Sequence, residues 1–333
     1  MNTSIEHRVT PVKHIMQTDA RHARLPHAAE YEGGAAFSGG RYSPIQDATV
    51  PMLDMGFRNA DATYDVVSVS RGMFFRLDYH LDRIDRSTER FRLRSPYDRA
   101  QTVEILTELL RLAGLRDAYV WWAVTRGVAR PGAASNRPSA YENRFYAFVM
   151  PYSFIADDEM RQRGFDMMIS RQYLRIPTES VDSRAKNFHW MDLRQSIFEA
   201  AEAGHQIPVL CDSRQMLAEC PGANIFVLAG GRLMTPAQHC LEGGTRQSVL
   251  DLAAEIRVPT FVGDIPASTL RAADEVFITS TAGGIMPVTR LEGQPIGRGT
   301  PGPITTLLHN LYWEKRWAGW HATPVRYEFK AGL

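Results

Sequence analysis

The octapeptide Ser183-Arg-Ala-Lys-Asn-Phe-His-Trp190 places Lys186 among small and aromatic residues, directly before a helical pattern that starts near Asp192. Apolar surroundings and neighbouring cations both disfavour the charged form of a lysine. A neutral lysine amine can form a Schiff base with an aldehyde or a ketone. A solvated loop lysine is the ordinary alternative, so other parts of the chain must separate these two interpretations.

The composition of the chain limits its class. Its 333 residues are enough for two domains, and 44% of them are hydrophobic, which is enough for a large core. The formal net charge of +1, from 38 basic and 37 acidic residues, gives no electrostatic argument for a nucleic acid or a membrane as partner. No apolar run reaches the length of a membrane span, and the N-terminus lacks the apolar segment of a secretory signal. Cys211, Cys220 and Cys240 are odd in number and lack metal-ligand spacing, so we expect no metal site and a reducing cytoplasm.

Hydrophobic periodicity predicts hairpins mixed with helices. A tight turn is expected at Gly39-Gly40, a second turn at Arg71-Gly72 and a long loop over residues 127–143. Strands are expected at 64–70, 73–77, 118–125, 145–152, 165–170, 208–212, 224–228, 232–235 and 275–279. Helices are expected from about residue 78 to 91 and at 99–113, 192–203 and 245–256. Because strands and helices do not alternate regularly, the pattern predicts an α+β fold.

The same patterns predict how the chain divides. We expect an N-terminal arm over residues 1–32, a small α+β domain over 33–150, a linker at 151–157 and a larger domain over 158–333. In the strand at 118–125, alternation puts Tyr119 and Trp121 on one face.

Four further segments carry chemistry. Glu219 precedes an apolar strand, where a buried carboxylate can pair with a protonated ring nitrogen. Gly243-Gly244-Thr245-Arg246 opens a helix, whose first amides are a ready site for a phosphate. Ser280-Thr-Ala-Gly-Gly284 adds hydroxyls at a strand end, and Arg83 offers a guanidinium for bidentate phosphate binding. Taken singly, each has a structural alternative: a turn glutamate, an ordinary helix start, a turn and a solvated helix face.

Taken together, the segments resemble those of fold-type IV pyridoxal-phosphate (PLP) enzymes. That class includes branched-chain aminotransferases, D-amino acid aminotransferases, aminodeoxychorismate lyases and (R)-selective amine transaminases. The resemblance runs from about Gly33 to Tyr327 and is strongest to the (R)-selective amine transaminases, with Ala-Gly-Gly after Thr281 as its most specific feature. The matching segments are Phe57-Arg-Asn-Ala-Asp-Ala-Thr-Tyr-Asp-Val66, Phe75-Arg-Leu-Asp-Tyr-His-Leu81, Ala185-Lys-Asn-Phe-His-Trp190 and Thr281-Ala-Gly-Gly-Ile-Met-Pro287.

The resemblance implies a two-domain architecture like that of D-amino acid aminotransferases, with PLP bound by the larger domain. It also implies a homodimer in which the partner's small-domain loop completes each site. By position, Lys186 resembles the Schiff-base lysine and Glu219 the partner of the pyridine nitrogen. The residues that resemble the family's phosphate-binding residues are Arg83, Gly244, Thr245 and Thr281. The residues that fall where the substrate pocket would be are Asn59, Tyr64, Val66, Tyr119, Trp121, Trp190 and Ala282. For the carboxylate of the keto acid, we favour Arg130 over Arg137 in the loop 127–143.

The chain departs from the subgroup at several of these positions. Asn59 stands where the subgroup usually has His, Tyr119 at a usual Phe, and Trp121 where one branch has Glu; these bear on substrate preference. Cys220-Pro221 replaces Gly-Ser, and Gly244 replaces Ile; these bear on how firmly the cofactor is held. None of the departures removes a catalytic group.

The expected function is therefore PLP-dependent transfer of an amino group between an (R)-configured primary amine, or a D-amino acid, and a keto acid such as pyruvate. A branched-chain or D-amino acid aminotransferase or a lyase on the same scaffold remains open, because these enzymes share the catalytic residues. A non-catalytic relative is disfavoured by the joint presence of Lys186, Glu219 and Arg83. A nicotinamide dehydrogenase is disfavoured because no G-x-G-x-x-G follows a strand.

Overall fold

The computed structural model describes residues 8–134 and 137–328, which fall into two compact units. The first unit contains residues 17–153, 185–189 and 319–328. The second contains residues 8–16, 154–184 and 190–318. The short segment 185–189, which carries Lys186, thus belongs to the first unit although the chain on both sides of it belongs to the second.

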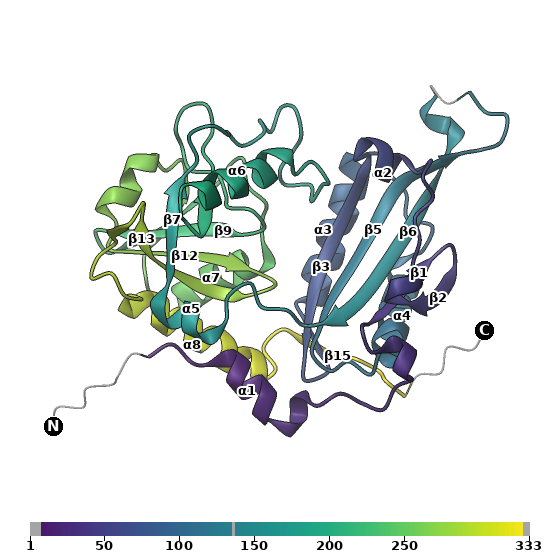
Figure 1. Cartoon of the computed structure of the whole chain (residues 1–333), viewed down its shortest axis with the longest axis horizontal. Helices are drawn as coiled ribbons and strands as arrows, with labels where there is room; N and C mark the ends of the chain where they lie inside the picture. The colour runs from purple at the N-terminus through teal and green to yellow at the C-terminus, as the bar shows by residue number, and fades with distance from the viewer. Residues whose placement is uncertain (1–7, 135–136, 329–333) are drawn as a thin grey trace. The chain divides into compact units, whose positions relative to one another are not determined.

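The first unit is built on a seven-stranded antiparallel sheet with the order β15-β4-β3-β5-β6-β1-β2 (Figure 1). Both predicted turns are confirmed: Gly39-Gly40 and Arg71-Gly72 have positive φ at both residues, as two-residue hairpins require. Arg71 tolerates this strained conformation at φ 55°. The strands are β1 (Ala35–Ser38), β2 (Arg41–Pro44), β3 (Ala62–Ser70), β4 (Met73–Phe75), β5 (Ala118–Ala129), β6 (Tyr141–Pro151) and β15 (Ala322–Pro324).

Two helices, α3 (Leu77–Arg90) and α4 (Arg99–Leu112), cover one face of this sheet (Figure 1). Asp98 caps α4 by accepting from the backbone N of Gln101, and Leu106 and Leu110 of α4 are fully buried. Burial of each such side chain stabilises the fold by about 1.5–3 kcal/mol. In β5, the residues that enter this core are Ala118, Val120, Trp122 and Val124. The other face of the sheet therefore carries Tyr119 and Trp121, as alternation predicts.

The loop expected over residues 127–143 is shorter than predicted, because β5 continues to Ala129 and β6 begins at Tyr141. The ladder shifts register between Thr125 and Val128, with Gly127 at φ 76°. A Cβ on Gly127 would lie 1.7 Å from the carbonyl oxygen of Glu142, so only glycine fits this bulge. The glycine that indicated a loop is instead part of the ladder.

The second unit contains an eight-stranded mixed sheet with the order β11-β10-β9-β12-β13-β7-β8, and β14 pairs with β13 (Figure 1). The pairs β7–β8, β7–β13 and β10–β11 are parallel. The strands are β7 (Phe165–Ile169), β8 (Ile207–Val209), β9 (Asn224–Ala229), β10 (Arg232–Pro236), β11 (Thr260–Gly263), β12 (Glu275–Ser280), β13 (Gly284–Leu291) and β14 (Gln294–Pro295). The helices are α5 (Asp158–Arg163), α6 (Met191–Glu202), α7 (Gly244–Glu255) and α8 (Pro303–Trp317). The mixture of strands and helices in the two units confirms the α+β fold.

The sequence patterns did not identify β13 and α8. In β13, Gly284 and Pro287 conceal a strand that is buried over most of its length. In α8, the buried Leu308, Tyr312 and Trp313 follow helical spacing, but the segment begins in a stretch rich in glycine and proline.

The segment expected to be an arm over residues 1–32 is structured where it is described, with helix α1 (Val12–Thr18) and two short 3-10 helices. Its residues 1–7 lie outside the described part of the chain. Helix α2 (Met55–Asn59) precedes β3. The 3-10 helices are η1 (Ala20–His22), η2 (Ala29–Tyr31), η3 (Ile45–Asp47), η4 (Pro138–Ala140) and η5 (Ala267–Ala272). Over residues 8–134 and 137–328, no helix has both the length and the apolar character needed to cross a membrane.

Candidate active site

The backbone of Lys186 is fixed on the edge of β3. The short strand β4 pairs only with residues 69–70 of β3 and leaves the earlier part of that edge available. There Tyr64 N donates to the carbonyl oxygen of Lys186 at 3.1 Å, and Thr63 Oγ1 donates to the same oxygen at 2.7 Å. Lys186 N in turn donates to Ser87 Oγ of α3 at 3.3 Å. Three bonds to two elements thus hold the lysine, and they explain why segment 185–189 belongs to the first unit.

The side chain of Lys186 ends beside aromatic rings. Its Nζ lies 4.3 Å from the ring centroid of Tyr64. The Tyr64 ring contacts Phe188 with centroids 5.3 Å apart and Trp121 with centroids 5.8 Å apart. Residues on three segments, β3, β5 and 185–189, therefore build an aromatic wall at the amine, and the ring quadrupole of Tyr64 attracts its cationic form.

Four predicted pocket residues of the first unit, Tyr64, Val66, Tyr119 and Trp121, share one face of the sheet. Val66 pairs across the strands with Trp121, and Trp121 pairs with Phe148, whose ring stacks on it with centroids 5.0 Å apart. Tyr119 also stacks on Phe148, with ring centroids 6.3 Å apart. We call this set, Tyr64, Val66, Tyr119, Trp121, Phe148 and Phe188, the aromatic face. Sequence analysis missed Phe148 and Phe188, although alternation within the strand at 145–152 would have put Phe148 on this face.

Next to Trp121 and Phe188, the first unit contains a cavity of about 580 Å³. None of the described residues that line it carries a charged side chain. The hydroxyls of Tyr146 and Thr125, which also line it, both donate to the buried carboxylate of Asp54, at 2.7 and 2.9 Å. The remaining lining residues are Ala36, Phe37, Ser38, Ile45, Ala48, Thr49, Val50, Gly56, Phe57, Ala60, Ala147 and Phe148. This space suits an apolar group.

Arg83 is buried beneath the sheet and held by Asp65 of β3. Its Nε donates to Asp65 Oδ2 at 2.8 Å and its Nη2 to Oδ1 at 2.7 Å, while His80 Nδ1 lies 2.7 Å from Oδ1. Burial alone would raise the pKa of Asp65, but the charges of Arg83 and His80 outweigh it and hold this pKa well below its usual range. Burial lowers the pKa of His80. Asp65 and His80, which the sequence patterns did not indicate, fix the orientation of the Arg83 guanidinium.

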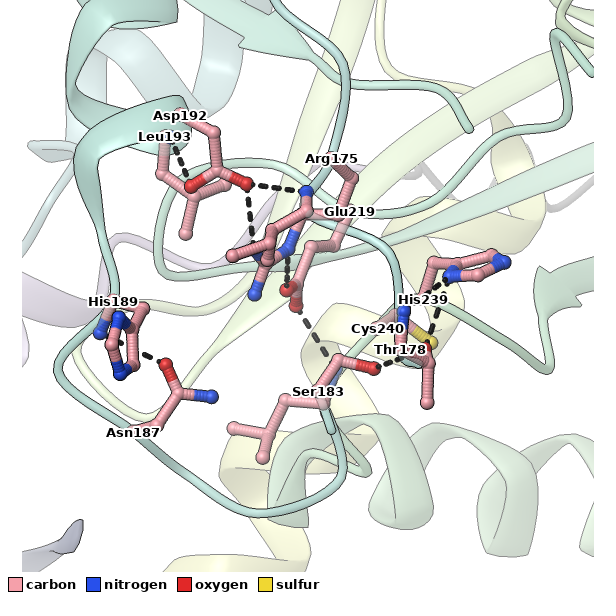
Figure 2. Close-up of polar contacts among 12 residues, drawn as sticks. Arg175, Thr178, Ser183, Asn187, His189, Asp192, Leu193, Glu219, His239 and Cys240 are labelled. Carbon is pink, nitrogen blue, oxygen red and sulfur yellow. Dashed lines mark hydrogen bonds and ion pairs between the residues drawn. The ribbon is translucent and has the colours of Figure 1, made fainter. Parts of the chain in front are cut away.

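Glu219 of the second unit is buried and carries a donor on each oxygen (Figure 2). Arg175 Nε donates to Oε1 at 2.8 Å, and Leu241 N donates to Oε2 at 3.0 Å. The same Arg175 donates through Nη1 to Asp192 Oδ2 at 2.7 Å. Sequence analysis found Glu219 but missed Arg175 and Asp192, because no local pattern marks an arginine in an irregular loop as buried.

The glycine turn before α7 has the properties of an anion site. Gly243 is the N-cap of α7. Because glycine has no side chain, it makes no side-chain cap bond to the first amides of the helix. A Cβ on Gly243 would lie 2.2 Å from Asn224 Oδ1, and Asn224 itself donates to the carbonyl oxygen of Leu241 at 2.7 Å. Gly244 and Thr245 follow as the first buried residues of α7. A helix start of this kind favours a phosphate.

The other predicted site residues lie at the ends of elements. Thr281 and Ala282 form the turn between β12 and β13, where Ile155 N donates to Ala282 O at 2.9 Å. Trp190 is the N-cap of α6. Asn59 is exposed at the end of α2, and neither it nor Arg130 lines the cavity beside the aromatic face.

Comparisons with known proteins agree on one family. The family model of amino-transferase class IV matches residues 62–291. A putative branched-chain-amino-acid aminotransferase of Methanocaldococcus jannaschii is 29% identical over 275 residues, covering 82% of this chain and 93% of the relative. A D-alanine aminotransferase of Listeria monocytogenes is 29% identical over 279 residues, covering 81% and 92%.

Solved structures share the fold. The branched-chain amino acid aminotransferase from Thermobaculum terrenum, in its PLP form, superposes with a TM-score of 0.77 at 22% identity, covering 89% of this chain and 99% of that one. The branched-chain aminotransferase from Escherichia coli gives a TM-score of 0.78 at 23% identity, covering 88% and 99%.

Proposed function

This chain belongs to the class IV aminotransferases, enzymes that use pyridoxal phosphate, and from that premise we propose that its substrates are an (R)-configured primary amine, or a D-amino acid, and a keto acid such as pyruvate. The reaction converts the amine to a ketone and the keto acid to an amino acid. Bound PLP supplies an aldehyde that takes up the amino group and a ring that withdraws electrons from the reacting carbon.

The residues of the chain fit that cofactor. Lys186 would hold the cofactor through its aldehyde, and its Nζ, when free, would move the proton of the reacting carbon as general base and acid. The carboxylate of Glu219 would hold the ring nitrogen and favour its protonated form. The groups that would hold the phosphate are Arg83, the Gly244 and Thr245 backbone and Thr281. Each donor is a buried cation, an amide or a hydroxyl, which are the groups that bind phosphate.

The observation that carries the choice of an amine is the aromatic face with its uncharged cavity. A carboxylate buried against these rings would find no cation among the described residues that line the cavity, and an unpaired buried charge is costly. An aryl or alkyl substituent would instead exchange water for Trp121, Phe148 and Phe188. The (R) hand is supported by the four segments that resemble the (R)-selective subgroup, above all Thr281-Ala-Gly-Gly284.

The keto acid still needs a cation, and we propose Arg130. It is exposed at the start of the 130–140 loop, and its Nη2 donates to the carbonyl oxygen of Ser139. A neutral carbonyl is a weaker acceptor than a carboxylate, so Arg130 can exchange one for the other. Arg137, in the same loop, is the alternative.

We further propose a homodimer in which the partner's small-domain loop completes each site. Large apolar side chains are exposed on the segment before β3, including Met52 at 78% and Phe57 at 69%, as on surfaces that bind another chain. A cytoplasmic location is part of the proposal and is supported by Cys211, Cys220 and Cys240, which are buried free thiols.

A second candidate is an aminotransferase for D-amino or branched-chain amino acids. The names of the relatives favour it, since they include a D-alanine aminotransferase and branched-chain aminotransferases. The two candidates share their catalytic residues and differ in whether the donor carries a carboxylate.

The deciding experiment compares amine donors with pyruvate as acceptor. We expect kcat/KM for (R)-1-phenylethylamine to exceed that for its (S) enantiomer by at least about a hundredfold, the discrimination that ~2.8 kcal/mol of differential binding gives. D-alanine and L-leucine with 2-oxoglutarate test the second candidate. Higher kcat/KM for either amino acid than for every amine would replace the first proposal by the second.

A further inference from the structure

We propose that Asp192 is a positioning residue that neutralises Arg175, so that Glu219 keeps its negative charge available for the ring nitrogen of PLP. The inference rests on the proposed role of Glu219. It concerns a group that does not itself touch the cofactor.

The three residues form one buried row in the second unit (Figure 2). Arg175 lies in the middle, with Glu219 on its Nε at 2.8 Å and Asp192 on its Nη1 at 2.7 Å. The side chains are 4%, 8% and 14% exposed for Arg175, Glu219 and Asp192, respectively. In so dry an environment, charges interact more strongly than they would at the surface.

The net charge of this row determines how strongly it attracts a bound cation. Arg175 and Glu219 alone would make a neutral pair, and a neutral pair attracts a pyridinium only weakly. With Asp192 the row carries one positive and two negative charges, a net charge of −1. Asp192 therefore preserves the field that keeps the ring nitrogen protonated, while Arg175 keeps the carboxylate of Glu219 in place.

Asp192 is itself fixed. Its Oδ2 also accepts from Ile176 N at 2.7 Å, and its Oδ1 accepts from Leu193 N at 2.8 Å. It stands in the first turn of α6, where the helix dipole favours an anion. Both acidic partners raise the pKa of Arg175 against the opposing effect of burial, so the guanidinium stays charged.

The other ionisable groups near Glu219 do not disturb this balance. Burial raises the pKa of the Cys240 thiol to about 12 and that of the Cys220 thiol well above its usual value, so both are neutral. Next to Cys240, the cation of Arg246 on α7 and the anion of Glu242 before it oppose one another. Arg246 is also bound to the carbonyl oxygen of Pro236 at 2.9 Å.

The test measures the proton on the ring nitrogen directly. The holoenzyme is prepared with PLP labelled with ¹⁵N in the ring, and the nitrogen chemical shift is followed against pH in the wild type and in Asp192→Asn. Removing one unit charge on the far side of a guanidinium should lower the pKa of the nitrogen by about one pH unit at an effective dielectric constant of ~20. Asp192→Glu, which restores the charge, should recover most of that shift.

Asp182→Asn is the matched control. Asp182 lies in the loop before α6, is 14% exposed like Asp192, and pairs with Arg184 rather than with Arg175. We expect the pKa of the PLP ring nitrogen in Asp182→Asn to equal that in the wild type. An Asp192→Asn shift no larger than the control's would overturn the proposal. If the Asn variant does not fold, Asp192→Ser, whose hydroxyl still caps Leu193 N, takes its place under the same criterion.

Glu219→Gln separates this inference from its premise. It should lower the nitrogen pKa by more than Asp192→Asn does, because Glu219 is the nearer charge. If Glu219→Gln leaves the nitrogen pKa unchanged, the role of Glu219 is wrong. If Glu219→Gln lowers it and Asp192→Asn does not, only the role of Asp192 is wrong.

Discussion

Asp65→Asn should destabilise the first unit strongly and weaken the proposed binding of the cofactor phosphate by Arg83, although Asp65 is not proposed to touch the cofactor. The carboxylate is fully buried and accepts from Arg83 Nε, Arg83 Nη2 and Val66 N, with His80 Nδ1 at 2.7 Å from it. Asparagine keeps the shape but leaves the arginine charge without its partner. Removing one member of a buried ion pair costs about 3–5 kcal/mol. For a unit of this size that corresponds to a fall in Tm of roughly 6–20 °C.

The pH dependence of this effect has a definite sign. The native pKa of Asp65 is depressed, so its contribution is complete above the ordinary aspartate pKa of about 3.9 and is lost only as the pH falls through the lower native value. The gap in stability between wild type and Asp65→Asn should therefore be constant from pH 7 to about pH 5 and should narrow below about pH 4.

The assay combines hydrogen exchange and cofactor binding. Exchange of the β3 and α3 amides measures the opening of the first unit without relying on a single two-state transition of the whole chain. Asp82→Asn is the control: Asp82 also lies on α3, but its pair with Arg99 is 51% exposed on both sides, so its loss should cost no more than about 1 kcal/mol. Equal effects of the two substitutions, or unchanged PLP affinity in Asp65→Asn, would refute the reasoning.

Three further substitutions test the proposed site. Glu219→Gln should retain PLP but lower kcat by at least about tenfold, because a neutral amide cannot stabilise the protonated ring nitrogen; wild-type turnover would make Glu219 structural only. Trp121→Ala should extend activity to bulkier amines by enlarging the cavity of about 580 Å³ that Trp121 lines, and relative rates that do not change across a series of donor sizes would place Trp121 outside the pocket. Arg130→Ala should raise the KM for pyruvate by roughly ten- to a hundredfold, the loss of a charged hydrogen bond of about 1.5–3 kcal/mol, and leave the KM for the amine nearly unchanged. Equal effects on both KM values would shift attention to Arg137.

Local sequence patterns predicted the elements that short-range residue preferences are enough to specify. The hairpin at Arg71-Gly72 was predicted because a glycine and alternating apolar residues suffice to specify it. Tyr64, Val66, Tyr119 and Trp121 were predicted as pocket residues from the resemblance, and strand register explains why they share a face. The β5–β6 loop was predicted to be too long because Gly127 marks a bulge, which composition does not distinguish from a loop.

The contacts that orient the predicted groups could not be found in this way. Asp65 and His80 beneath Arg83, and Arg175 and Asp192 beside Glu219, look like ordinary charged residues in the sequence. Only the fold shows that they are buried and paired, because each pair joins segments that are 15 to 44 residues apart. The resemblance supplied the groups proposed to touch the cofactor, whereas the residues that position them follow from the tertiary structure.

The most direct test of the account is to find where the cofactor is bonded. Reduction of the PLP-loaded enzyme with borohydride, followed by peptide mapping, should place the cofactor on the peptide that contains Lys186, and Lys186→Ala should lose both this adduct and turnover by several orders of magnitude. The chain offers Lys13, Lys315 and Lys330 as internal controls. Cofactor attached to any of these lysines in the wild type, or an unchanged rate in Lys186→Ala, would contradict the central claim.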